Sequence, residues 1–142
     1  MSRSGYTDDI DNWQLIMWRG RVASAIRGKR GQALLREMLE AMDALPEKRL
    51  VASALEAEGQ FCALGTVGQK RGVDMSELDP ENYETVAAKF GIATPLAQEI
   101  FWENDEAWGP GEAPEARFKR MRAWVVSNIK TVPASPSPVQ EG

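Results

Sequence analysis

Apolar residues recur along most of this chain at three- and four-residue steps, the spacing of helices that bury one face. The first such stripe follows a capping Asp11 or Asn12 and consists of Leu15, Trp18, Val22 and Ile26. A Gly-Lys-Arg-Gly segment at residues 28–31 then interrupts the pattern. A second stripe, which is predicted to end before Pro46, consists of Leu34, Leu35, Met38, Leu39 and Met42.

Further helix signals follow in the second half of the chain. Residues 61–70 predict a short helix that ends near Gly72, and residues 48–58 fit either a short helix or an extended segment. Asp79-Pro80 and Thr94-Pro95 each place proline directly after a capping side chain, which predicts two helix starts. Pro114 opens the last predicted helix. We therefore predict an all-α fold, a single compact domain of about five to seven helices over residues 1–130. Residues 131–142 contain three prolines and are predicted to form a disordered tail.

The composition limits where the protein works. Of the 142 residues, 43% are hydrophobic and 27% are charged, as in a globular domain. No apolar run approaches the roughly 20 residues of a membrane helix, and the first residues carry no signal-peptide pattern. The single cysteine cannot form an intramolecular disulfide. These features predict a cytoplasmic protein that does not bind membranes.

The absence of histidine narrows the chemistry. It removes Ser-His-Asp and Cys-His catalysis and histidine-liganded metals. A catalytic Cys62 would need a base to form its thiolate, and no histidine supplies one. We therefore expect no catalytic residue, no cofactor and no bound metal, and predict that the chain is not an enzyme.

Charge is arranged in blocks on a chain whose net charge is -4. Residues 12–36 contain no acid and six bases: Arg19, Arg21, Arg27, Lys29, Arg30 and Arg36. Residues 73–115 hold eleven acids and one lysine, and residues 117–130 are basic again. The blocks either neutralise one another within the fold or leave a face exposed for a partner. The candidate partner-binding residues are Arg27, Lys29, Arg30, Arg21 and Trp18, while Arg19 is expected to pair with an acid.

Residues 86–100 have the spacing of a helix-turn-helix, with Gly91 at the turn. The second helix carries acids that would face the phosphate backbone, so we interpret the motif as a packing corner. Its acidic row is predicted to be a solvated face rather than a Mg²⁺ site, and it is the second candidate interface. The row consists of Glu99, Glu103, Asp105 and Glu106.

A Cys-Ala-Leu-Gly segment at residues 62–65 is followed by Asn104-Asp105. This pairing resembles a group of small all-helical phage and prophage-type proteins with no assigned activity, and the likeness covers residues 59–124, about half of the chain. The segment WRGRVASAIRGKRGQ is also similar to phage-encoded proteins. The resemblance implies a helical fold and an origin in a mobile element. From the residues themselves, Cys62 and Asn104-Asp105 are expected to be structural.

Together these patterns favour a non-enzymatic binding protein of phage or prophage origin. We expect it to act by protein–protein contact, as a host-directed inhibitor of the counter-defence or anti-CRISPR-like kind. Its partner would be a host protein or a protein–nucleic acid complex. The alternative is a nucleic-acid or nucleotide-binding protein that uses the basic block from Arg19 to Arg30. Whether the basic block or the acidic middle forms the interface, and whether the chain forms a homo-oligomer, stays open at this point.

Overall fold

The computed structural model describes residues 12–109 and 111–130. Its helices are α1 Asn12–Arg27, α2 Lys29–Asp43, α3 Ala63–Arg71, α4 Tyr83–Phe90, α5 Thr94–Asp105 and α6 Pro114–Asn128. A 3₁₀ turn at Met75–Glu77 and an antiparallel hairpin of β1 Glu56–Ala57 and β2 Gln60–Phe61 complete the regular structure of these residues. The predicted all-α fold with a single compact domain is confirmed. The tail predicted for residues 131–142 lies outside the described residues.

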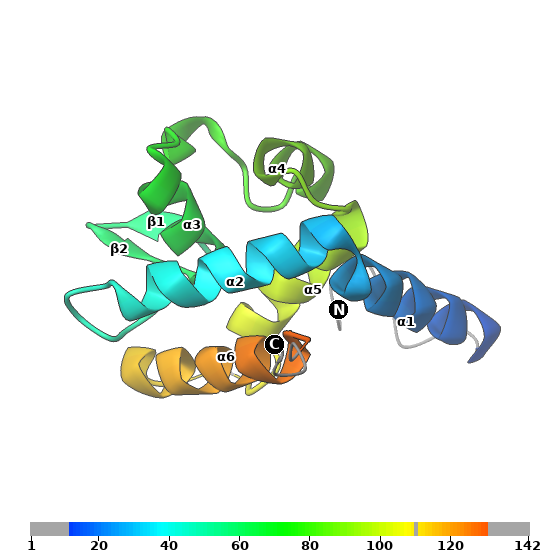
Figure 1. Cartoon of the computed structure of the whole chain (residues 1–142). Helices are drawn as coiled ribbons and strands as arrows, with labels where there is room; N and C mark the ends of the chain where they lie inside the picture. Colours follow the sequence, from blue (N-terminus) through cyan, green and yellow to red (C-terminus); the bar gives the residue numbers. More distant parts are fainter. Residues whose placement is uncertain (1–11, 110, 131–142) are drawn as a thin grey trace, which may run out of the picture.

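Helices α2 and α5 hold the domain together, because each contacts α1, α3 and α6. Figure 1 shows α2 running across the molecule, with α6 below it, α4 above it, α3 and the hairpin near one end, and α1 at the other end. Fully buried side chains from four helices meet in the core. They include Leu35, Met38, Leu64, Ile100 and Met121.

The junction between α1 and α2 is a tight elbow. The helix break is confined to Gly28, so Lys29 and Arg30 already belong to α2 and not to the turn that the sequence predicted. A Cβ atom on Gly31 would lie only 1.9 Å from the Ala25 carbonyl oxygen, which shows how closely the two backbones approach. The buried side chain of Gln32 also stabilises this junction.

The Gln32 side chain ties three segments together at this elbow. Its Nε2 donates to the carbonyl oxygens of Ile26 at 2.8 Å and Asn128 at 3.0 Å. Its Oε1 accepts a hydrogen bond from the Lys130 backbone N–H at 2.8 Å. The direction of α1 is therefore set by backbone contact and by one buried amide, which also binds the end of α6.

The helix-turn-helix spacing forms a packing corner, as predicted. Gly91 adopts a φ of 72°, which favours glycine, and it ends α4. Ala87, Ile92 and Ile100 are buried where α4 and α5 meet. The start predicted at Asp79-Pro80 is wrong, because α4 begins at Tyr83 with Asn82 as its cap.

The segment from residue 48 to 61 takes the extended alternative. The Val51 N–H donates to the Phe61 carbonyl at 3.0 Å, and the Cys62 N–H donates to the Leu55 carbonyl at 3.2 Å. Glu58 and Gly59 have φ values of 54° and 79°, the two positive angles that a tight two-residue hairpin turn requires. The hairpin thus leads directly into α3.

Candidate protein-binding surface on helix α1

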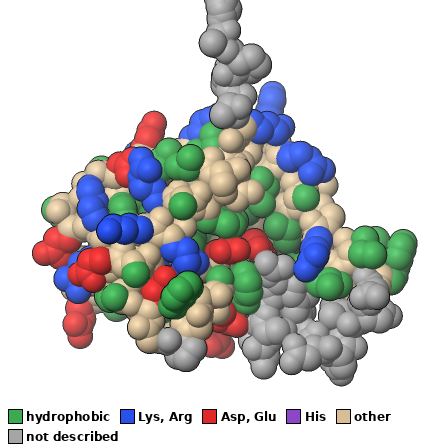
Figure 2. Space-filling view, turned by 90° about the horizontal axis from the view of Figure 1, so that it is seen from below, with side chains coloured by type: hydrophobic (Ala, Val, Ile, Leu, Met, Phe, Trp, Pro, Cys, Tyr) green, Lys and Arg blue, Asp and Glu red, His purple; other side chains and the backbone are tan. Residues whose placement is uncertain are grey.

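Helix α1 carries apolar residues on two opposite sides. Val22 is buried, and Trp18 and Ile26 are half-buried on the side that faces the domain. Trp13, Ile16 and Met17 lie on the other side, where 68%, 61% and 44% of each residue is exposed. Their steps of three and four residues align them in one outward stripe. Figure 2 shows hydrophobic side chains gathered at the end of the molecule where α1 projects. Large apolar side chains exposed together are typical of a contact surface.

Gly20 continues the outward stripe by one more turn. It is exposed, and a Cβ atom built on it would meet no other atom within 4 Å. The outward face of α1 is therefore bulky in its first half and flat at Gly20. We call the line Trp13, Ile16, Met17 and Gly20 the outward stripe.

The predicted basic residues surround this stripe. On a helical projection, Arg27 lies about 40° from the line of Trp13, whereas Arg19 and Arg21 lie on its two flanks. All three are exposed, as are Lys29 and Arg30 at the start of α2. None of the five forms an ion pair with another residue of the described ranges. The pairing expected for Arg19 is therefore not seen among residues 12–109 and 111–130.

Lys29 and Arg30 occupy a position that does not favour the fold. They lie in the first turn of α2. This turn contains no acidic residue, and its cap, Gly28, offers no side-chain hydrogen bond. The positive end of a helix repels cations, so neither charge stabilises α2. Their charges remain available to an anionic partner.

Trp18, which the sequence placed at the interface, lies on the inner side of α1. It lines a groove of about 410 Å³ with Val22, Ile26, Glu99 and Asn128. The exposed tryptophan of α1 is Trp13, which is not among the predicted interface residues. The signal was present, because Trp13, Ile16 and Met17 have the same helical spacing as the inward stripe.

The predicted acidic row does not form a single solvated face. Glu99 is buried at 6% exposure, which corrects the expectation that it faces solvent. The Glu103 Oε1 atom lies 3.7 Å from the Arg120 Nη1 atom, so the two side chains form an ion pair. The Asp105 Oδ1 atom accepts a hydrogen bond from the Asn104 Nδ2 at 2.6 Å. Glu106 is exposed on the surface. Neighbouring atoms remove part of the water around its carboxylate, and this desolvation, together with the Asp105 charge, raises its pKa. No group of three metal-ligating side chains occurs in the described residues.

Exposed acids gather instead around the 3₁₀ turn and the start of α4. They are Asp74, Glu77, Asp79, Glu81 and Glu84. All five belong to the acidic stretch of residues 73–115, but the predicted acidic interface is the row at residues 99–106 and not this group. The exposed cations of α1 and the start of α2 and the exposed acids around the 3₁₀ turn and the start of α4 therefore form two separate surfaces.

Asn104 joins the Cys-Ala-Leu-Gly segment to the rest of the domain. Its Oδ1 accepts the Ala63 N–H at 3.1 Å, and its Nδ2 donates to the Val51 carbonyl at 2.9 Å. The side chain is buried, so each bond replaces one that water would otherwise make. The predicted structural role of Asn104-Asp105 is confirmed.

Cys62 is held inside the domain at the start of α3. It is 1% exposed, and its Sγ accepts the Gly65 N–H at 3.3 Å. Burial, reinforced by the Asp105 charge, raises the pKa of the thiol to about 12. The thiol therefore stays protonated and caps a helix, in agreement with the predicted structural role.

We expect Cys62 to resist alkylation in the folded protein. The rise in its pKa from 9.0 to about 12 lowers the thiolate fraction near pH 8 by about a thousandfold, and burial slows access further. The measurement is the rate of iodoacetamide labelling by mass spectrometry, with guanidinium-unfolded protein as the fast control. Equal labelling rates in both states would contradict this assignment.

No family model, curated protein or solved structure matches this chain. The likeness to phage and prophage-type proteins therefore stays a prediction. In the described part of the chain, no helix is long and apolar enough to cross a membrane. The fold and the candidate site define a small all-α domain with an exposed basic and apolar face on α1 and the start of α2.

Proposed function

We propose that this chain is a non-enzymatic binding protein that contacts an acidic protein surface through α1. The contact surface comprises the outward stripe and the cations Arg27, Lys29 and Arg30. The observation that carries the proposal is the exposure of Trp13, Ile16 and Met17 on one helix face. An apolar centre with a charged rim is the usual anatomy of a protein–protein interface.

The outward stripe favours a protein partner over a nucleic acid. Nucleic-acid contacts combine cations with aromatic rings on which bases stack, and Trp13 could supply one such ring. Ile16 and Met17 offer no stacking plane, yet they gain free energy when buried against another apolar surface. The surrounding cations would then select a partner whose apolar groove has an acidic border.

We further propose that the partner belongs to a bacterial host and that binding inhibits it, in the manner of a counter-defence or anti-CRISPR-like factor. The small size of the chain and the likeness of residues 59–124 to phage and prophage-type proteins support this proposal. A helix face that is already formed also suits an inhibitor, because little free energy is lost in ordering it on binding.

We expect charge reversal at Arg27, Lys29 and Arg30 to abolish partner capture while the fold is kept. The immobilised protein would be incubated with bacterial lysate, with and without nuclease, and compared with the Arg27→Glu/Lys29→Glu/Arg30→Glu variant. Lys29→Glu and Arg30→Glu place two acids at the positive end of α2, which offsets the single acid that Arg27→Glu places at the negative end of α1, so the melting temperature should change little. Circular dichroism would verify the helix content.

Two matched variants make this result specific. Ile16→Ser/Met17→Ser removes apolar surface without changing charge, and it should weaken capture as well. Lys89→Glu/Lys119→Glu reverses two exposed charges on α4 and α6, and it should leave capture unchanged. Recovery of nucleic acid alone, lost after nuclease treatment, would support the nucleic-acid alternative. Capture that survives both the charge-reversal variant and Ile16→Ser/Met17→Ser would contradict the proposed surface.

A further inference from the structure

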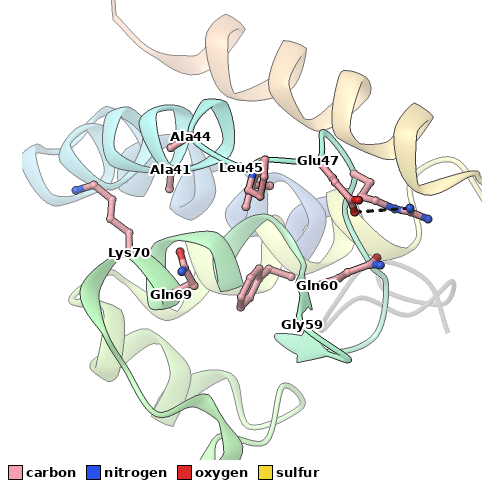
Figure 3. Close-up of a pocket in the computed structure, with 11 residues that line it drawn as sticks. Ala41, Ala44, Leu45, Glu47, Gly59, Gln60, Gln69 and Lys70 are labelled. Carbon is pink, nitrogen blue, oxygen red and sulfur yellow. Dashed lines mark ion pairs between the residues drawn. The ribbon is translucent and has the colours of Figure 1, made fainter.

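A cleft of about 530 Å³ lies on the domain away from the outward stripe. It opens between the end of α2, the loop that follows it, the hairpin and α3, and α1 contributes no residue to it. Figure 3 shows Ala41, Ala44 and Leu45 on one side of the space and Gly59, Gln60 and Gln69 on the other. The volume falls within the range of small-molecule sites.

Several of the residues that line this cleft are apolar. Leu45 and Phe61 are both half-buried, and Ala41 is buried beside them. Phe61 is the only aromatic residue among those that line the space. A ring or a branched aliphatic group could pack against Phe61 and Leu45 and lose contact with water.

Two cations at the cleft have hydrogen-bonding capacity that the fold does not use. The Arg49 Nε is buried and has no hydrogen-bond partner among the described residues. The nearest carboxylate oxygens, of Glu47 and Glu115, lie 3.9 Å and 3.8 Å from the guanidinium nitrogens, beyond hydrogen-bond distance. The Nε atom itself is closed to solvent, but the Arg49 side chain is 34% exposed, so its terminal nitrogens can donate to a bound acceptor.

Lys70 supplies the second cation. Its Nζ lies 3.6 Å from Glu37, but the Glu37 carboxylate already accepts hydrogen bonds from Arg71 at 2.6 Å and 3.0 Å. Gln60 and Gln69 add two side-chain amides at the cleft. Glu47 is the only acid of the lining, and its side chain is 70% exposed. The charged side chains of the lining are thus two cations and one acid, and this excess of positive charge favours an anion.

We propose that this cleft binds a small amphipathic carboxylate, with an aromatic or branched aliphatic body against Phe61 and Leu45 and its carboxylate on Arg49. The guanidinium can donate two parallel hydrogen bonds to a carboxylate, which fixes the orientation of the ligand. This site is independent of the α1 surface, so either proposal can fail without the other.

The test is a nuclear magnetic resonance titration of the full chain with three probes that share one ring: phenylacetate, 2-phenylethanol and 2-phenylethylamine. We expect saturable amide shifts at Gly59, Phe61 and Gln69 with phenylacetate. The affinity should be at least about tenfold weaker for the alcohol and the amine, because neither carries the anion that Arg49 would bind. Amides of α1 should not shift.

Two variants locate the carboxylate. Arg49→Gln should weaken phenylacetate binding by about tenfold, since it removes a charge-assisted hydrogen bond. Gln69→Glu adds an acid at an exposed position and should weaken it independently, which keeps the test valid if Arg49→Gln fails to fold. Lys119→Gln, on a distant exposed position of α6, is the neutral control. Absence of saturable shifts, equal binding of amine and carboxylate, or shifts away from the cleft would each overturn the proposal.

Discussion

Replacing Arg117 by methionine should destabilise the domain by about 3–5 kcal/mol, because the guanidinium is the hub of a buried polar network. Arg117 is 7% exposed. It donates to the carbonyl oxygens of Asn104 at 3.0 Å, Leu50 at 3.0 Å and Glu112 at 3.3 Å. Methionine fills similar volume but removes the side-chain donor of the Leu50 and Glu112 carbonyls, and it leaves the Asn104 carbonyl with only the longer Arg120 Nη2 contact at 3.5 Å. The melting temperature should fall by roughly 10 °C or more.

Arg122→Met is the matched control for this variant. Arg122 lies on the same helix and forms a two-bond pair with Asp43 at 2.8 Å and 3.0 Å, but both partners are exposed. Exposed pairs contribute little because water and salt screen them. Thermal unfolding followed by circular dichroism should therefore show almost no change. If both variants lowered the melting temperature by similar amounts, the buried hydrogen bonds of Arg117 would not be a main source of stability.

Gly65→Ala should prevent the native packing of α3 on the hairpin. A Cβ atom at this position would lie 2.0 Å from the Leu55 carbonyl oxygen and 3.3 Å from the Phe61 Cβ. The Leu55 carbonyl belongs to the backbone and accepts the Cys62 N–H, so it cannot rotate away as a side chain would. We expect a loss of about 3 kcal/mol or more in the free energy of unfolding, measured by urea denaturation.

Gly20→Ala provides the opposite expectation from the same substitution. Gly20 lies within α1, is exposed, and has no atom within 4 Å of an added Cβ. Alanine there should stabilise the helix by about 1 kcal/mol, because glycine loses more backbone entropy on folding. A stable Gly65→Ala protein would show that the hairpin and α3 do not approach as closely as described.

The helices and their inward stripes could be predicted because a single period specifies them. The stripe of Leu34, Leu35, Met38 and Met42 is buried, and α6 begins at Pro114 as expected. Gly72 and Gly91 end α3 and α4 with positive φ values, which only a glycine adopts readily. These signals are local, so the sequence alone carries them.

The burial of Glu99 and the Arg117 network depend on contacts between distant residues, whereas the error at Asp79-Pro80 has a local cause. Glu99 appeared to be exposed because its own helix is acidic, but the packing of α5 within the domain buries it. Asp79-Pro80 has the form of a helix start, yet its Asp79 Oδ1 accepts the Glu81 N–H in a turn, and Asn82 caps the helix. The Arg117 network joins residues up to 67 positions apart and leaves no spacing to detect.

The candidate site was predicted in part. Arg21, Arg27, Lys29 and Arg30 are exposed, as the sequence suggested. The sequence predicts Trp18 both in the inward stripe of the first helix and at the interface, and only the inward position is correct. The contacts of α1 with α2 and α5 hold that side against the domain and leave Trp13 on the outer side.

The elbow at Gly28 and Gly31 shapes the domain without using the residues that we propose as the partner contact. It sets the direction of α1 through the Gln32 amide and backbone contact, and none of these uses a residue of the outward stripe. Residues 13, 16, 17 and 20 could therefore be exchanged as a set while the scaffold persists. The domain would then serve as a small helical platform on which a library of α1 faces selects new partners.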